Sequence, residues 1–313
     1  MTTQFAFVFP GQGSQAVGML DAWGDHPEVA RTLAEASAAL GEDIGALIKN
    51  GPKEQLDLTT NTQPVMLTAG IACYRAWIAE TGLTPAAAAG HSLGEYTALV
   101  ASGALSLADA LPLVRFRAQA MQEAVPVGVG AMYAILGLDG EAVRAGCAQA
   151  TAETGEVIEA VNFNDPKQTV IAGSKAGAEK AAEILKAAGA KRALPLPVSA
   201  PFHSSLMKPA AERLKERLAA TNFDAQAFPV INNIDVAVTD NADALRDALY
   251  RQAFGPVRWV EVVQALKARG ITHIIECGPG KVLAGMAKRI DGELQSATVL
   301  DPVSLAEVKG MLL

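Results

Sequence analysis

Short apolar segments that favour β-strands alternate with long alanine- and leucine-rich helical patterns along this chain. FAFVFP at 5–10 precedes a helical region that runs to about residue 80, and AAAAGHS at 86–92 precedes two further helical patterns. Such alternation is typical of a parallel sheet covered by helices, so we predict an α/β fold. In such sheets ligands bind at the carboxyl ends of the strands. We therefore expect both glycine-containing turns that follow these segments to lie at the ligand-binding site.

The pattern changes in the middle of the chain, where a strand, a helix, a strand pair, a helix and a strand follow one another. That order, βαββαβ, is the ferredoxin-like unit. Prolines at 195, 197 and 201 then mark the return to the main domain, where FPVINNI and HIIECGPG are expected to complete its sheet. We predict a parallel-sheet, hydrolase-like α/β core domain from 1–127 and 199–313, with an inserted ferredoxin-like small domain at 128–198.

The charge balance argues against nucleic acid as a partner. Lys and Arg number 26 against 33 Asp and Glu, which gives a net charge of -7, and no basic run stands out. No stretch approaches the ~20 apolar residues of a membrane span. The N-terminal MTTQFAFVFPGQG lacks a basic region before an apolar run too short for a secretory signal. We therefore expect no nucleic-acid and no membrane partner.

The cysteines Cys73, Cys147 and Cys277 are odd in number, widely spaced and without a CxxC pair. This pattern argues against a disulfide framework or a zinc site, so we interpret them as reduced thiols of a cytoplasmic protein. We also expect a monomer that uses no metal and no cofactor, with coenzyme A entering only as part of a substrate.

The residues Gly-His-Ser-Leu-Gly at 90–94 satisfy G-x-S-x-G between a small-residue strand and a helix. In that context the sharp turn exposes the Ser92 hydroxyl, and the helix N-terminus favours a developing oxyanion. Ser92 and Glu95 also fit S-x-x-E, a helix capping box that needs no catalysis. The motif alone leaves both interpretations open.

A second turn, FPGQGSQ at 9–15, follows the first strand. Gly11 and Gly13 let the backbone approach a ligand closely, and the missing G-K-[ST] ending excludes a phosphate-binding P-loop. By itself this is an ordinary glycine-rich turn. Together with the serine turn, it could supply a second donor to an oxyanion.

A serine nucleophile needs a base, and the sequence offers four histidines. His203 is the best candidate because it lies in SAPFHSSLMKP, a proline-bounded loop where the chain re-enters the main domain. His26 sits in a polar turn, His273 begins an apolar strand, and His91 adjoins the serine in a turn whose neighbours generally point apart. A loop histidine is more often structural than catalytic, so position alone does not decide.

Two arginines flank the apolar stripe of the helix that begins near Leu107. Arg117 lies on one flank and Arg115 on the other, and periodicity does not choose between them. The stripe itself is formed by Leu111, Val114, Ala118 and Met121.

Taken in order, these motifs resemble the malonyl-CoA:acyl carrier protein transacylases, the acyltransferase family shared by fatty-acid and polyketide synthases. No carrier segment or ketosynthase accompanies them, which indicates a discrete acyltransferase of type II fatty-acid synthesis. The resemblance covers nearly the whole chain through FVFPGQGSQ, TQPV, GHSLGEY, the R-x-x-x-M-Q-E-A pattern from Arg117, GAMYAILG, NFND..QTVIAG, SAPFHSSLM, QAFGPVRW and ECGPGKVL.

The resemblance implies a ping-pong transfer of malonyl from malonyl-CoA to the phosphopantetheine thiol of acyl carrier protein. Ser92 would be the nucleophile and His203 the base, with the backbone amides of Gln12 and Leu93 as the oxyanion hole. Arg117 would hold the malonyl carboxylate, for which its planar fork suits better than Lys.

Three further positions carry implied roles. A backbone carbonyl near Gln252 would orient the histidine in place of a triad aspartate. Asn162 matches a position near the acyl pocket. Phe202 resembles the malonyl-selective version of its loop.

The first alternative is a Ser-His-acid hydrolase or thioesterase, because Asp165 falls in the Ser, Asp, His order of that class. Against it, Asp165 lies inside the inserted unit, and hydrolases lack a GQGSQ turn before the serine. The second is a non-catalytic acyl-CoA-binding module, if Ser92 only caps its helix. The third is a trans-acting acyltransferase of a polyketide synthase.

Overall fold

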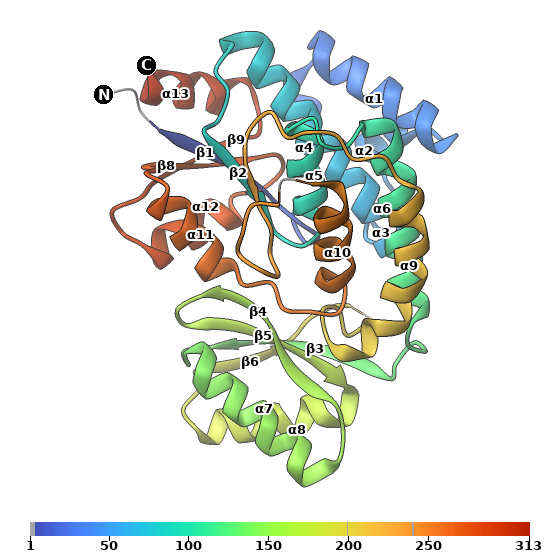
Figure 1. The fold of residues 1–313 in the computed structure, drawn as a ribbon, viewed down its shortest axis with the longest axis vertical. Helices are drawn as coiled ribbons and strands as arrows, with labels where there is room; N and C mark the ends of the chain where they lie inside the picture. Colours follow the sequence, from blue (N-terminus) through green and yellow to red (C-terminus); the bar gives the residue numbers. More distant parts are fainter. Residues whose placement is uncertain (1–3, 199, 240) are drawn as a thin grey trace.

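The computed structural model describes residues 4–198, 200–239 and 241–313. Residues 1–3, 199 and 240 lie outside the described part (Figure 1). Residues 1–3 begin the N-terminal segment MTTQFAFVFPGQG, which we expected not to be a secretory signal. Residue 199 is the first residue of the SAPFHSSLM segment, with which the second stretch of the predicted core domain begins.

The predicted parallel sheet is confirmed in the described part of the chain. Its strand order is β7-β2-β1-β8-β9, and every neighbouring pair is parallel (Figure 1). The central strand β1 reads FAFVF and is buried throughout, as expected for a strand covered on both faces. The strands are β1 (Phe5–Phe9), β2 (Ala87–Gly90), β7 (Val230–Ile231), β8 (His273–Cys277) and β9 (Gln295–Val299).

Helices cover both faces of this sheet because the side chains of β1 alternate between two apolar cores. Its three phenylalanines pack into one core, and Ala6 and Val8 pack into the other. The first core includes residues of α1 (Pro27–Leu40), α2 (Ile44–Asn50), α3 (Lys53–Leu56), α4 (Thr59–Thr81), α5 (Leu93–Ala101), α6 (Leu107–Glu123), α9 (Lys208–Ala220), α10 (Ala242–Gln252) and α13 (Pro302–Leu312), and the second includes residues of α11 (Trp259–Ala268) and α12 (Val282–Ile290).

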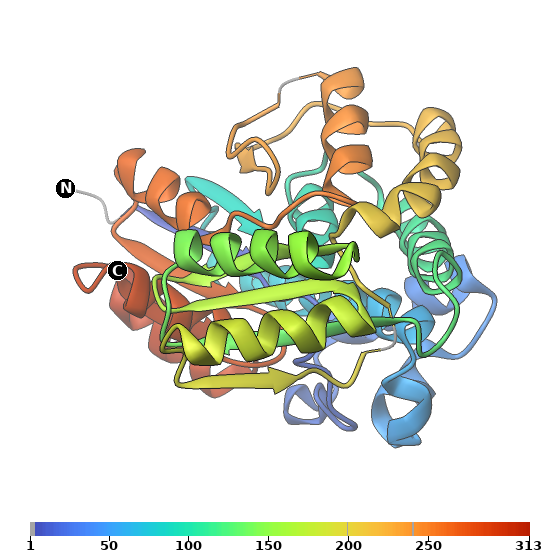
Figure 2. The same ribbon diagram turned by 90° about the horizontal axis from the view of Figure 1, so that it is seen from below.

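A second, antiparallel sheet has the strand order β4-β5-β3-β6. Viewed from below, α7 and α8 lie side by side across its outer face, where they enclose a separate apolar core (Figure 2). The elements follow the predicted order as β3 (Gly130–Leu136), α7 (Gly140–Thr154), β4 (Ile158–Asp165), β5 (Gln168–Ser174), α8 (Lys175–Ala187) and β6 (Arg192–Pro195).

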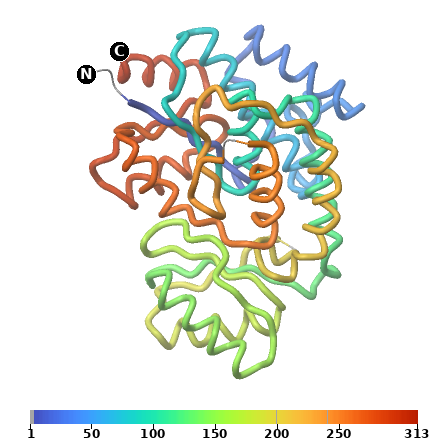
Figure 3. The backbone as a smooth tube through the Cα atoms, in the orientation of Figure 1, coloured from blue at the N-terminus to red at the C-terminus, as the bar shows by residue number. Residues whose placement is uncertain are grey.

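The inner face of the antiparallel sheet packs against the rest of the molecule. The chain enters it after α6 and leaves it after β6 (Figure 3). Met132 and Val161 share one apolar cluster with Met121 of α6 and with Phe202. The backbone of Val257 bonds with β4 on both sides, accepting from the Phe163 amide at 2.9 Å and donating to Val161 at 2.8 Å. A cavity lies between this face, which contributes Met132 and Asn162, and the turns that follow β1 and β2.

The strands at the sheet edges differ from the predicted lengths. β6 ends at Pro195 although RALPLPV suggested a longer strand, since prolines cannot donate to a ladder. FPVINNI forms only the two-residue strand β7. The sequence analysis did not identify β9, whose QSATV pairs with β8 at the edge of the sheet. Two 3-10 helices, η1 (Asp21–Trp23) and η2 (Ser205–Met207), complete the described elements.

Candidate active site

Ser92 lies on the turn between the carboxyl end of β2 and the first residue of α5. Its backbone φ is 52°, a value that residues with a Cβ seldom adopt and that recurs at functional sites. The helix packs very closely on the sheet here. A Cβ on Gly90 would lie 1.9 Å from the carbonyl carbon of Gly94, and a Cβ on Gly94 would lie 2.0 Å from the carbonyl oxygen of Phe9. Both glycines of G-x-S-x-G are required by this contact.

The capping box that Ser92 and Glu95 could form is absent. The Ser92 side chain accepts no hydrogen bond from the N–H groups of α5. The Glu95 carboxylate instead accepts bonds from the Asn233 amide at 2.8 Å and from the Gln252 side chain at 3.0 Å. The helix-cap interpretation of Ser92 is therefore wrong, and its hydroxyl is left for other contacts.

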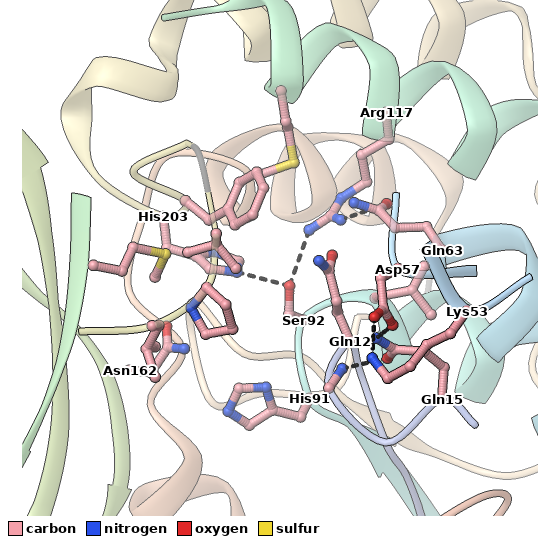
Figure 4. A pocket seen from close by; sticks show the side chains of 18 residues that line it. Gln12, Gln15, Lys53, Asp57, Gln63, His91, Ser92, Arg117, Asn162 and His203 are labelled. Carbon is pink, nitrogen blue, oxygen red and sulfur yellow. Dashed lines mark hydrogen bonds and ion pairs between the residues drawn. The ribbon is translucent and has the colours of Figure 1, made fainter. Parts of the chain in front are cut away.

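That hydroxyl points at His203. Ser92 Oγ lies 2.7 Å from His203 Nε2 (Figure 4). On the other side of the ring, His203 Nδ1 lies 2.9 Å from the backbone oxygen of Gln252. A carbonyl oxygen can only accept, so Nδ1 carries the hydrogen and Nε2 faces the serine as an acceptor.

The environment of His203 keeps its imidazole neutral. Burial, followed by the positive charge of Arg117, lowers the pKa of His203 to about 3, although the bond to the Gln252 carbonyl opposes the shift. The histidine is therefore unprotonated near pH 7, which is the form that accepts a proton from an attacking hydroxyl.

Asp165, the acid that a hydrolase-type triad would use, is engaged elsewhere. Its Oδ2 accepts a bond from Arg289 Nε at 2.8 Å, and its Oδ1 accepts one from the Lys167 amide at 2.9 Å. The position of an orienting acid on His203 is occupied by the Gln252 carbonyl. The geometry thus disfavours the Ser-His-Asp interpretation.

Two backbone amides near Ser92 have no acceptor among the described residues. These are the N–H groups of Gln12, in the turn after β1, and Leu93, at the first turn of α5. The Ser92 amide, in contrast, donates to Asn233 Oδ1 at 2.8 Å and is already engaged. Gln12 and Leu93 both line the cavity that holds Ser92, as a pair of oxyanion donors would.

Arg117 reaches the same serine from α6. It is 1% exposed, and its Nη2 donates to Ser92 Oγ at 3.1 Å. Its other partners are neutral: Gln63 Oε1 accepts at 2.8 Å and Gln252 Oε1 at 3.0 Å. Arg115, on the opposite flank of the helix, pairs with Glu42 near the surface instead. The structure thus separates the two arginines that periodicity could not.

A cavity of about 650 Å³ surrounds Ser92, His203 and Arg117. Asn162 and Phe202 are among the residues that line it, and the Asn162 side-chain oxygen is buried without a partner among the described atoms. Gln252 lies behind the cavity wall. The other lining residues are Gln12, Gly13, Gln15, Lys53, Asp57, Gln63, His91, Leu93, Met121, Met132, Leu196, Pro197 and Val198.

The contacts of three polar residues around Ser92 were not predicted from the sequence. His91, expected to point away from Ser92, also lines the cavity (Figure 4). Its Nε2 lies 2.8 Å from Asn164 Oδ1. Glu95 and Asn233 form a buried polar cluster beneath the serine turn. The only sequence signal for Glu95 was the capping pattern, which suggested a different contact.

The described residues contain no group of three or more His, Cys, Asp or Glu side chains that could hold a metal ion. Across the same residues, none of the helices combines the length and the hydropathy that a membrane crossing requires. The three cysteines are unpaired and buried.

Comparison with known proteins gives consistent matches. Residues 6–302 match the family model described as an acyl transferase domain. The malonyl CoA-acyl carrier protein transacylase of Escherichia coli strain K12 is 53% identical over 97% of this chain and 98% of its own length. The transacylase of the same name from Bacillus subtilis strain 168 is 47% identical, with 97% and 95% covered.

Solved structures agree with these sequence matches. The acyl-carrier-protein S-malonyltransferase of Burkholderia pseudomallei 1710b is 66% identical and superposes with a TM-score of 0.97, covering 98% of this chain and 100% of that one. A malonyl-transacylase in complex with a type II polyketide synthase acyl-carrier protein is 48% identical, with a TM-score of 0.96 over 99% and 100% of the two chains.

Proposed function

This chain belongs to the acyl transferase family, and we infer that it moves malonyl groups from malonyl-CoA to the phosphopantetheine thiol of acyl carrier protein. The observation that carries this function is the place of Arg117. A buried guanidinium, which has no carboxylate partner among the described residues, lies 3.1 Å from the Ser92 hydroxyl, inside the cavity. An acyl group on Ser92 that ends in a free carboxylate would give the guanidinium a directly bonded carboxylate partner.

We propose that acylation begins with attack of Ser92 Oγ on the malonyl thioester carbonyl. The hydroxyl proton passes to His203 Nε2, and the carbonyl oxygen becomes an oxyanion held by the amides of Gln12 and Leu93. Collapse of this intermediate breaks the C–S bond. The coenzyme A sulfur leaves with the proton from His203, and a malonyl ester remains on Ser92.

The second half of the reaction repeats these steps with the other thiol. The phosphopantetheine thiol of the carrier gives its proton to His203 Nε2 and attacks the ester carbonyl. Collapse then breaks the C–O bond, and Ser92 Oγ takes the proton back. One cavity thus serves two thioesters in turn, which is a ping-pong order. The Gln252 carbonyl keeps the imidazole oriented through both halves.

We propose that Asn162 and Phe202 shape the acyl end of the cavity, and that Gln252 acts on the substrate only indirectly. Its side chain bonds Arg117 from behind the cavity wall. Thioester hydrolysis is the second candidate. The Gln252 carbonyl in the place of an orienting acid disfavours it.

The deciding experiment is intact-protein mass spectrometry after the chain is mixed with malonyl-, acetyl- and methylmalonyl-CoA, followed by addition of holo acyl carrier protein. We expect one malonyl adduct that is absent in Ser92→Ala, and its transfer to the carrier at a rate far above its release to water. Release to water at an equal or higher rate would point to a hydrolase.

We also propose a domain division, a location and an oligomeric state for this chain. The βαββαβ order of β3 to β6 supports an inserted ferredoxin-like domain at 128–198 in a hydrolase-like core of 1–127 and 199–313. The unpaired cysteines support a cytoplasmic, reducing location. We also propose a monomeric enzyme whose product supplies extender units for fatty-acid synthesis.

A further inference from the structure

Arg117 belongs to a chain of buried side chains that ends in a carboxylate. Gln252 Oε1 accepts from Arg117 Nη2 at 3.0 Å, and Gln252 Nε2 donates to Glu95 Oε2 at 3.0 Å. All three residues are at most 2% exposed. The glutamine therefore separates a buried cation from a buried anion that could otherwise pair directly.

Glu95 is the carboxylate that balances Arg117. Of the other buried carboxylates in the described part of the chain, Asp165 pairs with Arg289, and Glu276 accepts a bond from the Ala284 amide of α12. Glu95 Oε2 also accepts from the Asn233 amide at 2.8 Å, so both of its bonds favour the ionised form. Burial opposes this and raises the pKa of Glu95 to about 7, which leaves the group ionised above that pH.

The spacer has a consequence for substrate binding. A carboxylate in direct contact with Arg117 would occupy the guanidinium edge that a malonyl carboxylate uses. Amide oxygens of Gln63 and Gln252 satisfy the guanidinium without adding charge. The counter-charge is present, but it acts at a distance.

We propose that Glu95 is a positioning residue that, through Gln252, serves as the counter-charge of Arg117 and limits how tightly the malonyl carboxylate is held. This inference rests on the proposed function of Arg117. A limited affinity suits an enzyme that must pass the malonyl group on. Extra ground-state affinity for malonyl lowers the malonyl-CoA concentration needed for loading, but it does not speed the transfer of malonyl from Ser92 to the carrier.

The test is Glu95→Gln, which keeps a hydrogen-bonding side chain and removes the charge. Single-turnover acylation of Ser92 is followed by intact mass at pH 8, where Glu95 is ionised in the wild type. We expect the half-saturating concentration of malonyl-CoA to fall by on the order of tenfold, because Arg117 loses its internal counter-charge. The value for acetyl-CoA should stay within about twofold, since acetyl has no carboxylate to respond.

Glu95→Asp is the matched control because it retains the charge. Its malonyl-to-acetyl ratio of half-saturating concentrations should resemble that of the wild type even if both rates fall. A purely structural role would instead weaken loading of both substrates together. An unchanged or higher malonyl value in Glu95→Gln overturns the proposal, as does an equal fall for acetyl-CoA.

A second variant decides the matter if Glu95→Gln does not fold. Gln252→Glu places a carboxylate directly on Arg117 and leaves the backbone oxygen that bonds His203 in place. The ratio of the malonyl to the acetyl half-saturating concentration should then rise at least about tenfold, even if both substrates load more slowly. An unchanged ratio would contradict the proposal. Failure of the wild type to acquire malonyl at all would instead remove the proposed function.

Discussion

His203 is the residue whose chemistry depends most on its surroundings. His203→Ala is expected to lower malonyl transfer about 10²- to 10⁴-fold, the usual range for a lost general base, with the fold retained. Because its pKa in the folded protein is about 3, the wild-type rate should persist on acidification well below the ordinary histidine pKa of 6.5. Quenched time courses of malonyl loading between pH 4 and 8 would measure how the rate depends on pH. An acid limb centred near pH 6.5 would contradict a neutral, buried base.

The same histidine affects stability with a definite sign. The pKa of His203 in the folded protein lies below the unfolded value of 6.5. At a pH between these two pKa values, His203 is protonated in the unfolded chain and neutral in the folded chain. The free energy of unfolding should therefore decrease as pH falls from about 6.5 toward 3, by up to ~1.4 kcal/mol per pH unit for one proton. Urea unfolding of wild type and His203→Ala at pH 7 and pH 5 would test it. The variant should show a smaller decrease between the two pH values.

Arg117 is expected to select the acyl group. Truncating one partner of a buried charge pair costs about 2 to 5 kcal/mol, so Arg117→Ala should lower malonyl loading about 30-fold or more. Acetyl loading should change little or rise, because the empty wild-type site holds a desolvated guanidinium. Arg115→Ala is the control, since that side chain pairs with Glu42 near the surface. The kcat/KM ratio of malonyl-CoA over acetyl-CoA should collapse in Arg117→Ala alone.

At the scale of elements, the contact of α5 with β1 and β2 sets the serine turn. Gly94→Ala would place a Cβ 2.0 Å from the Phe9 carbonyl oxygen, so the helix must move away from the sheet. We expect a loss of about 2 kcal/mol or more in unfolding free energy, together with loss of Ser92 acylation. Gly310→Ala in α13 is a matched control, because nothing lies within 4 Å of its added Cβ. Thermal melts and intact mass would measure the two effects. A Gly94→Ala protein with the stability and the Ser92 acylation of the wild type would contradict the close packing of α5 on Phe9.

At the scale of the whole molecule, the cavity depends on how the antiparallel sheet docks on the rest of the chain, where β4 packs against α11 and α12. Asp165 of β4 and Arg289 of α12 form one ion pair across this junction, with the arginine half exposed. Asp165→Asn is expected to reduce stability by roughly 1 kcal/mol and to leave malonyl transfer within a few-fold of wild type. A loss comparable to that of His203→Ala would restore the Ser-His-Asp interpretation. Parallel melts and transfer assays of the two variants provide the comparison.

Much of the fold followed from local pattern. FAFVF, the GHSLG turn and the middle βαββαβ segment each carry their own periodicity and punctuation, so their elements appear in the predicted order. The edge strands β7 and β9 were shortened or missed because their pairing depends on neighbours distant in sequence. Local periodicity contains no information about such partners.

The sequence by itself determined the candidate residues: a serine on a glycine-flanked turn, a loop histidine, and an arginine beside an apolar stripe. Tertiary structure decided their partners. It brought His203 to 2.7 Å from Ser92 across 111 positions and gave the imidazole a backbone carbonyl in place of Asp165. It also showed that Glu95, which the sequence offered as part of an alternative capping box, is a buried carboxylate linked to Arg117 by Gln252. The physical reason is that burial and charge pairing act through space, whereas sequence spacing constrains contacts only within one element.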